Sequence, residues 1–212
     1  MRARYRPVIA GVAAVALLMG SVSCGDVTKD RSAVTILIET LETASGADPG
    51  NFSGFLLSDV ETIVERQLGD ETVRVATIFN DFGQATMRII SKDAGTGAIS
   101  LNPTPWNSVT INRYRVTYTR SDGRNTPGVD VPFPIDGAVT ATLTPTPITV
   151  PFEVVRHQAK LEQPLRSLAG FGGRLFITTI AEVTFYGSDP YGNDVQAKGN
   201  FTVNFSDFAD PD

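Results

Sequence analysis

The feature that most restricts the fold of this chain is a two-residue alternation of apolar and polar side chains. In residues 138–144, Val139, Ala141 and Leu143 alternate with threonines, and the same spacing recurs in 113–119, 148–154 and 201–205. Successive side chains of a β-strand point to opposite faces of its sheet, so this period predicts half-buried strands of the antiparallel type. A strand-built domain is therefore expected.

Further strands are predicted where Val, Ile and Thr concentrate, at 33–41, 73–79 and 85–91, with turn signals such as Asp81-Phe82-Gly83 and Asp136-Gly137 between runs. The gaps are mostly too short for the helices of a parallel α/β fold. Residues 175–186 are apolar on much of both faces and are predicted to form a central strand. About eight strands at this spacing favour an all-β, antiparallel sandwich.

Two segments do not alternate in this way. Residues 58–68 contain Ser58-x-x-Glu61, a capping-box pattern, but are also rich in β-branched residues, so helix and strand both stay open. Residues 156–169 predict one or two helical turns interrupted at Pro164.

The amino terminus predicts export. Residues 1–7 carry three arginines and no acid, and residues 8–20 are apolar but too short to anchor a helix across a hydrocarbon core of about 30 Å. Residues 1–23 are therefore interpreted as a signal peptide. Polar residues 24–32 are interpreted as a tether, and 33–212 as a single domain.

The segment Ser21-Val22-Ser23-Cys24 resembles the lipobox of bacterial lipoproteins, although Ser21 stands where that family prefers leucine. The resemblance implies cleavage before Cys24 and attachment of fatty acyl chains, such as palmitate, to that residue. Gly25 replaces the aspartate that retains such proteins in the inner membrane, which implies an outer-membrane location. Ser21 and Ser23 also suit ordinary signal peptidase, which would release a soluble protein.

A second resemblance concerns residues 175–205. The turn Asp189-Pro190-Tyr191-Gly192-Asn193 lies between two predicted strands and is similar to the D-x-x-G-N turn before the last strand of bacterial immunoglobulin-like and fibronectin-like domains. It implies an immunoglobulin-like form of the sandwich and carries no implication for activity.

Charge and residue counts exclude several classes of function. Without the three leader arginines the chain has 15 basic and 23 acidic residues, a formal charge of −8, which disfavours nucleic-acid binding. One cysteine excludes an intrachain disulfide and a multi-cysteine metal cluster. His157 is the only histidine; it is a candidate general base, with Ser167 or Ser188 as nucleophile, although a hydrogen-bonded histidine beside a strand end is the more frequent arrangement. No cofactor is expected.

Three residues are candidates for ligand binding. Trp106 lies between Pro105 and Asn107 and could present its indole to a sugar or peptide, or fold back onto the core. Arg113 and Arg115 share the polar face of one predicted strand, where they could bind an anion or pair with neighbouring carboxylates.

Clustered oxygen ligands predict one metal candidate. Asp189, Asn193 and Asp194 could form a weak calcium site, whereas the alternative is a turn in which these side chains bind the backbone. The acidic tail adds Asp207, Asp210 and Asp212 to this comparison.

Taken together, the sequence predicts a non-enzymatic, lipid-anchored cell-envelope protein that binds or scaffolds a protein or glycan partner at the membrane surface. The alternatives are a carbohydrate-binding or adhesive module that uses Trp106, and a small envelope glycan hydrolase that uses paired carboxylates or His157.

Overall fold

The computed structural model describes residues 31–93 and 102–208, and strands dominate this part of the chain. The ten strands are β1 Val34–Ala44, β2 Phe55–Asp59, β3 Thr62–Leu68, β4 Glu71–Thr77, β5 Asp81–Ser91, β6 Val109–Thr119, β7 Ile135–Leu143, β8 Ile148–Val155, β9 Phe176–Ser188 and β10 Asp194–Ser206. The helices are all short: η1 Pro105–Asn107, α1 His157–Leu161 and η2 Leu165–Leu168. No helix in these residues is long and apolar enough to cross a membrane.

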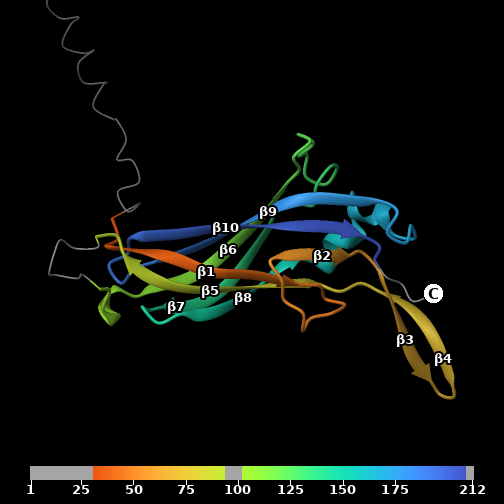
Figure 1. The fold of residues 1–212 in the computed structure, drawn as a ribbon, viewed down its shortest axis with the longest axis horizontal. Coiled ribbons are helices and arrows are strands. Elements are labelled where there is room, and N and C mark those ends of the chain that lie inside the picture. The colour runs from red at the N-terminus through yellow and green to blue at the C-terminus, as the bar shows by residue number, and fades with distance from the viewer. Residues whose placement is uncertain (1–30, 94–101, 209–212) are drawn as a thin grey trace, which may run out of the picture.

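The strands form two layers (Figure 1). One sheet has the order β1-β5-β8 and the other has the order β2-β10-β9-β6-β7. All pairs within these sheets are antiparallel except β2–β10, which is parallel. The predicted all-β sandwich is confirmed. It has two strands more than the eight expected, because β2 and β3 were not predicted as strands.

The core lies between the two layers and consists of the apolar side chains that alternate inward along the strands. Tyr114 and Phe185 of the larger sheet meet Phe152 of the smaller sheet, with ring centroids 5.7 and 5.4 Å from that of Phe152. Edge-to-face aromatic contacts of this kind add about 0.5–1.5 kcal/mol each to the free energy gained by burying the rings. Phe152 thus fastens the two sheets together.

The hydroxyl groups of two buried tyrosines also join the two sheets. The Tyr118 hydroxyl donates to the carbonyl of Val154, and the Tyr114 hydroxyl accepts from the Glu153 N–H at 3.0 Å. Burial raises the pKa of both tyrosines, and the Asp81 carboxylate raises that of Tyr118 further. Both therefore stay neutral and serve as hydrogen-bonding groups between strands β6 and β8.

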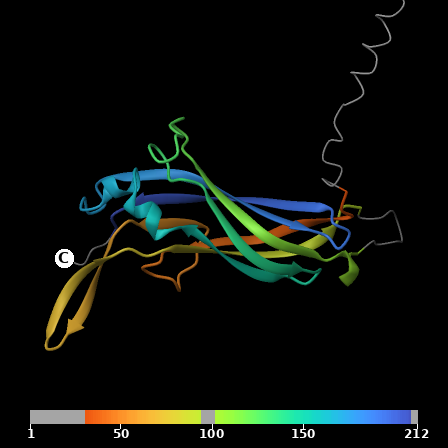
Figure 2. The ribbon, with the colours of Figure 1, turned by 180° about the vertical axis from the view of Figure 1, so that it is seen from behind.

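Strands β3 and β4 form a separate two-stranded sheet that projects from the body at the end opposite Arg31 (Figures 1 and 2). Gly69 in its turn has φ = 68°, a conformation that favours glycine. Residues 58–68 are thus extended: Ser58 caps no helix, and its hydroxyl donates to Asp81 Oδ2 at 2.6 Å.

The remaining sequence predictions have mixed outcomes. Strand β9 lies inside its sheet between β10 and β6, as predicted for 175–186, and residues 156–169 form α1 and η2 on either side of Pro164. The turns predicted at Asp81-Phe82-Gly83 and Asp136-Gly137 are wrong, because these residues lie at the starts of β5 and β7 and pair with β8 and β6. Of these residues, Asp81 is fully buried, held by partners from other parts of the chain.

Candidate functional site

The two ends of the molecule differ in surface chemistry. The end that includes Arg31, where the described chain begins, also holds η1 and the β9–β10 turn; it is called the tether end here (Figures 1 and 2). The opposite end holds α1, η2 and the β3–β4 hairpin and is called the far end.

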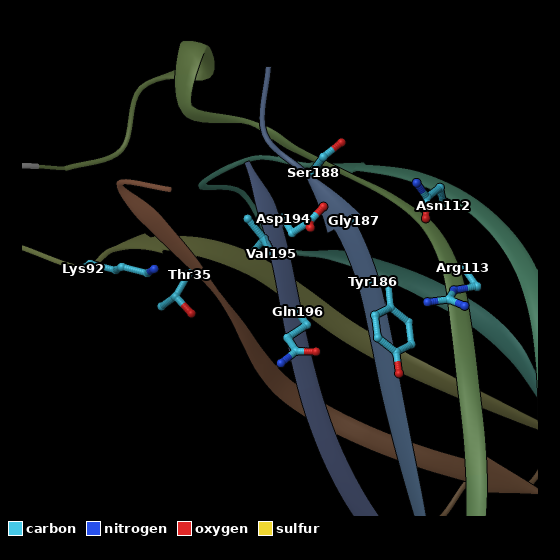
Figure 3. A pocket seen from close by; sticks show the side chains of 10 residues that line it. All are labelled: Thr35, Lys92, Asn112, Arg113, Tyr186, Gly187, Ser188, Asp194, Val195 and Gln196. Carbon is cyan, nitrogen blue, oxygen red and sulfur yellow. The ribbon is translucent and has the colours of Figure 1, made fainter. Parts of the chain in front are cut away.

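A pocket of about 580 Å³ opens at the tether end (Figure 3). Its lining includes Arg113 from β6, Tyr186 from β9 and Asp194 from β10, so the predicted anion-binding and calcium-binding candidates each contribute one residue to it. The Arg113 guanidinium lies 4.2 Å from the centroid of the Tyr186 ring, a cation–π contact. The β-bulge at Asn112 lets Arg113 keep the outward position opposite Tyr186.

Arg115 does not line this pocket. Its Nη1 donates to Asp136 Oδ2 on β7 at 2.7 Å, a cross-strand ion pair between half-exposed side chains. Exposed pairs of this kind contribute about 0–1 kcal/mol to the free energy of unfolding. The structure thus favours the pairing alternative for Arg115 over a ligand-binding role.

The calcium candidate is organised as a turn. Asp189 Oδ1 accepts from the N–H groups of Tyr191 and Asn193 at 3.0 and 2.9 Å, and its Oδ2 accepts from the Asn193 side-chain amide at 2.8 Å. Burial raises the pKa of Asp189, but these bonds and one from Ser32 outweigh it, so the pKa is lowered. Asp194 lies on the pocket described above, and the residues described contain no grouping of three His, Cys, Asp or Glu side chains suited to a metal.

Trp106 is 83% exposed and does not fold back onto the core. It lines a small hollow of about 130 Å³ at the tether end together with Arg31 and Tyr191, whose own side chain is 81% exposed. The sequence left the direction of the indole open, and the structure turns it to solvent.

Two of the catalytic candidates, His157 and Ser167, are hydrogen-bonded to neighbouring groups. His157 Nδ1 lies 3.0 Å from Asn80 Oδ1, which also accepts the His157 N–H, and the Ser167 hydroxyl donates to the Pro164 carbonyl at 2.6 Å. Ser188 lies on the tether-end pocket, whereas His157 begins α1 at the far end. Asp207 accepts from the N–H groups of Gly170 and Gly172, while Asp210 and Asp212 lie outside the described residues.

Sequence reasoning missed a buried ion pair at the far end. Lys160 Nζ lies 2.9 Å from Asp81 Oδ1, and both side chains are inaccessible to solvent. Asp81 Oδ1 also accepts from the Gly46 N–H, and its Oδ2 accepts from Ser58. Burial raises the pKa of the Asp81 carboxyl, although Lys160 opposes this effect. The pair fastens α1 to the start of β5.

An apolar surface on the larger sheet at the far end was also not predicted. The sequence does not indicate that one face of strand β9 is exposed to solvent. The register places Thr202 of β10 between Phe55 of β2 and Ile180 of β9, and Asn204 between Leu57 and Thr178. Phe176, Ile180, Phe55 and Leu57 point outward and are 69, 51, 50 and 46% exposed. These four residues are called the far-end face below.

The fold and these surfaces define an all-β sandwich protein with an open pocket at one end and an exposed apolar sheet face at the other. A scan against protein-family models finds no match, and neither does a search of the curated proteins.

Proposed function

We propose that this protein is a non-enzymatic, lipid-anchored cell-envelope protein that binds a protein partner through its far-end face. The lipid is carried by Cys24, and the outer membrane is the proposed location. The sandwich acts as a rigid support that holds the binding surface away from the lipid.

The observation that carries the binding proposal is the exposure of four large apolar side chains on the same face of β2 and β9, which flank β10. Large apolar side chains that gather on an exposed face, rimmed by polar residues, are a mark of protein interaction sites. The partly exposed aromatic rings also match the composition of interface centres, in which aromatic residues are enriched.

The chemistry of the face favours a protein partner with an apolar surface. Thr178, Thr202 and Asn204 lie between its apolar side chains, and none of these residues is charged. The charged pair of Lys198 and Glu182, with 2.8 Å between Nζ and Oε1, lies further toward the tether end. An anionic membrane would require basic residues around the face, and the exported chain is acidic.

Site-specific photo-cross-linking in the native envelope tests this function. A photoreactive phenylalanine at Ile180 is expected to give a discrete covalent adduct with another protein, because Ile180 lies in the far-end face. The same label at Thr140, an exposed position on β7 of the same sheet, serves as the matched control. Adducts at Thr140 equal to those at Ile180 would contradict the proposed surface.

A second measurement separates the anchor from the binding surface. The intact mass of the native protein is expected to equal that of residues 24–212 with a diacylglyceryl group and one further acyl chain. A mature chain without lipid would contradict the anchor and leave the cross-linking result to decide the partner function.

A further inference from the structure

The hollow at the tether end carries two aromatic side chains that the proposed binding function does not use. Trp106 and Tyr191 are the most exposed aromatic residues described, and both line this hollow beside Arg31. They come from different parts of the chain, η1 and the β9–β10 turn, which the fold brings to the same end.

The backbone beneath each ring is held by hydrogen bonds. Asn107 Oδ1 accepts from the Thr104 N–H and hydroxyl at 2.9 and 3.0 Å, which closes the turn that carries Trp106. Asp189 accepts the Tyr191 N–H in the turn already described. Both rings are therefore presented to solvent from ordered turns, at a defined place on the surface.

Indole and phenol groups combine an apolar ring with a polar N–H or O–H. For this reason Trp and Tyr concentrate at the headgroup level of membranes, where the ring leaves water and the polar atom keeps its hydrogen bonds. A pair of such rings exposed at one end of a protein suits a lipid surface.

The chain length places this end close to the membrane. Arg31 follows Cys24 by seven residues. A fully extended chain of that length spans at most about 25 Å. If lipid is attached to Cys24, Arg31 and the tether end are thus held within about 25 Å of the bilayer surface.

We propose that Trp106 and Tyr191 form a membrane seat that inserts into the headgroup region of the bilayer that holds the Cys24 lipid. This inference rests on the anchor in the proposed function. The seat supplements the lipid by fixing the orientation of the sandwich, so that the far-end face and the β3–β4 hairpin point away from the membrane.

Trp106 is the only tryptophan, so its fluorescence reports on this site directly. The lipidated protein is reconstituted into phosphatidylethanolamine and phosphatidylglycerol vesicles, with or without phospholipid brominated near the carbonyl end of its chains. Since interfacial side chains lie roughly 5–10 Å into the headgroup and acyl boundary, brominated lipid is expected to lower the emission about twofold. Tyr191→Trp in a Trp106→Phe background is expected to respond in the same way.

The matched control moves the only tryptophan to the far end, by Phe176→Trp in the same Trp106→Phe background. Its emission is expected to be insensitive to brominated lipid. Equal quenching of Trp106 and the Phe176→Trp reporter, or no quenching of Trp106 in a protein that floats with the vesicles, would overturn the seat and leave the anchor intact.

Two other outcomes are also decisive. A protein that carries no lipid and stays behind when vesicles float would contradict the anchor and the seat together. A shift of Trp106 emission on addition of N-acetylglucosamine oligomers, without any response to vesicles, would make Trp106 a sugar-stacking residue and overturn the seat.

Discussion

At the scale of single residues, the ion pair between Lys160 and Asp81 is the least replaceable polar contact described. Each charge has lost its water, and the Asp81 carboxylate is compensated by Lys160, Ser58 and the Gly46 N–H. Attraction within such a pair roughly offsets the cost of desolvation, whereas one buried charge left alone is strongly destabilising.

Lys160→Met is therefore expected to lower the free energy of unfolding by about 3–5 kcal/mol, since it leaves the Asp81 carboxylate buried without a cation. Adding Asp81→Asn to Lys160→Met removes that charge and is expected to recover part of the loss. Urea unfolding of the two variants and the parent measures both effects. A double variant no more stable than Lys160→Met would show that the carboxylate charge is not the source of the loss.

Asp59 gives a residue-scale prediction with a defined pH dependence. Burial raises the pKa of its carboxyl, and the nearby Asp207 adds to this, while bonds from Thr62 and the Phe208 N–H oppose it. A carboxyl whose folded-state pKa lies above its unfolded value adds stability at low pH, and that contribution is lost as the pH rises through the folded-state pKa.

Asp59→Asn removes the ionisable carboxyl, and with it the loss of stability as the pH rises. The free energy of unfolding of the variant minus that of the parent is expected to be larger at about pH 7 than at about pH 3.5. The reason is that only the parent must keep a buried carboxylate ionised at the higher pH. Unfolding curves at the two pH values measure the difference, with the exposed Asp70→Asn as control. A relative stability that does not change with pH would contradict the raised pKa.

At the scale of elements, the close pairing of β9 with β6 depends on a glycine. Gly187 pairs with Ile111, and a Cβ atom at Gly187 would lie 2.4 Å from the Thr110 carbonyl oxygen. Backbone atoms cannot move away without disturbing the ladder, and the tether-end pocket is built on these same strands.

Gly187→Ala is expected to lower the free energy of unfolding by about 3 kcal/mol, at the upper end of overpacking costs. Gly54→Ala is the control, because a Cβ atom there meets nothing within 4 Å. The control is expected to stay within about 0.5 kcal/mol of the parent in thermal or urea unfolding. A Gly187→Ala protein as stable as the control would show that the two strands are not so closely apposed.

The β3–β4 hairpin is an element whose two faces differ. Val64 pairs with Val75 and Arg66 with Val73 on one face, while the other face carries the Glu65–Arg74 ion pair and a Gln67–Thr72 hydrogen bond. The sequence left this region open between helix and strand because β-branched residues and a capping-box pattern coincide there. Pairing between residues 62–68 and 71–77 selects the strand.

At the scale of the whole molecule, the two proposals describe the two ends of one elongated body. The tether end presents Trp106 and Tyr191, and the far end presents the apolar face of the larger sheet. Anchoring one end and binding at the other requires a stiff connection between them. The core described above, with Phe152 and the buried tyrosines joining the two sheets, supplies that stiffness.

The alternation in the sequence by itself determined the all-β class, most strands and the inward faces of Tyr114, Val116 and Tyr118, because a strand's period of two is a local property. The absence of alternation in 156–169 likewise predicted the two helical turns around Pro164. The lipid at Cys24 and the resemblance to immunoglobulin-like domains are still predictions.

Only the tertiary structure decided which apolar faces are covered. Phe176 and Ile180 belong to a strand that is apolar on both faces, yet within the part of the chain that the structure describes their side chains are left exposed. The burial of Asp81 likewise depends on Lys160, 79 residues further along the chain. Burial is set by segments distant in sequence that pack on a residue, and the local pattern holds no record of that packing.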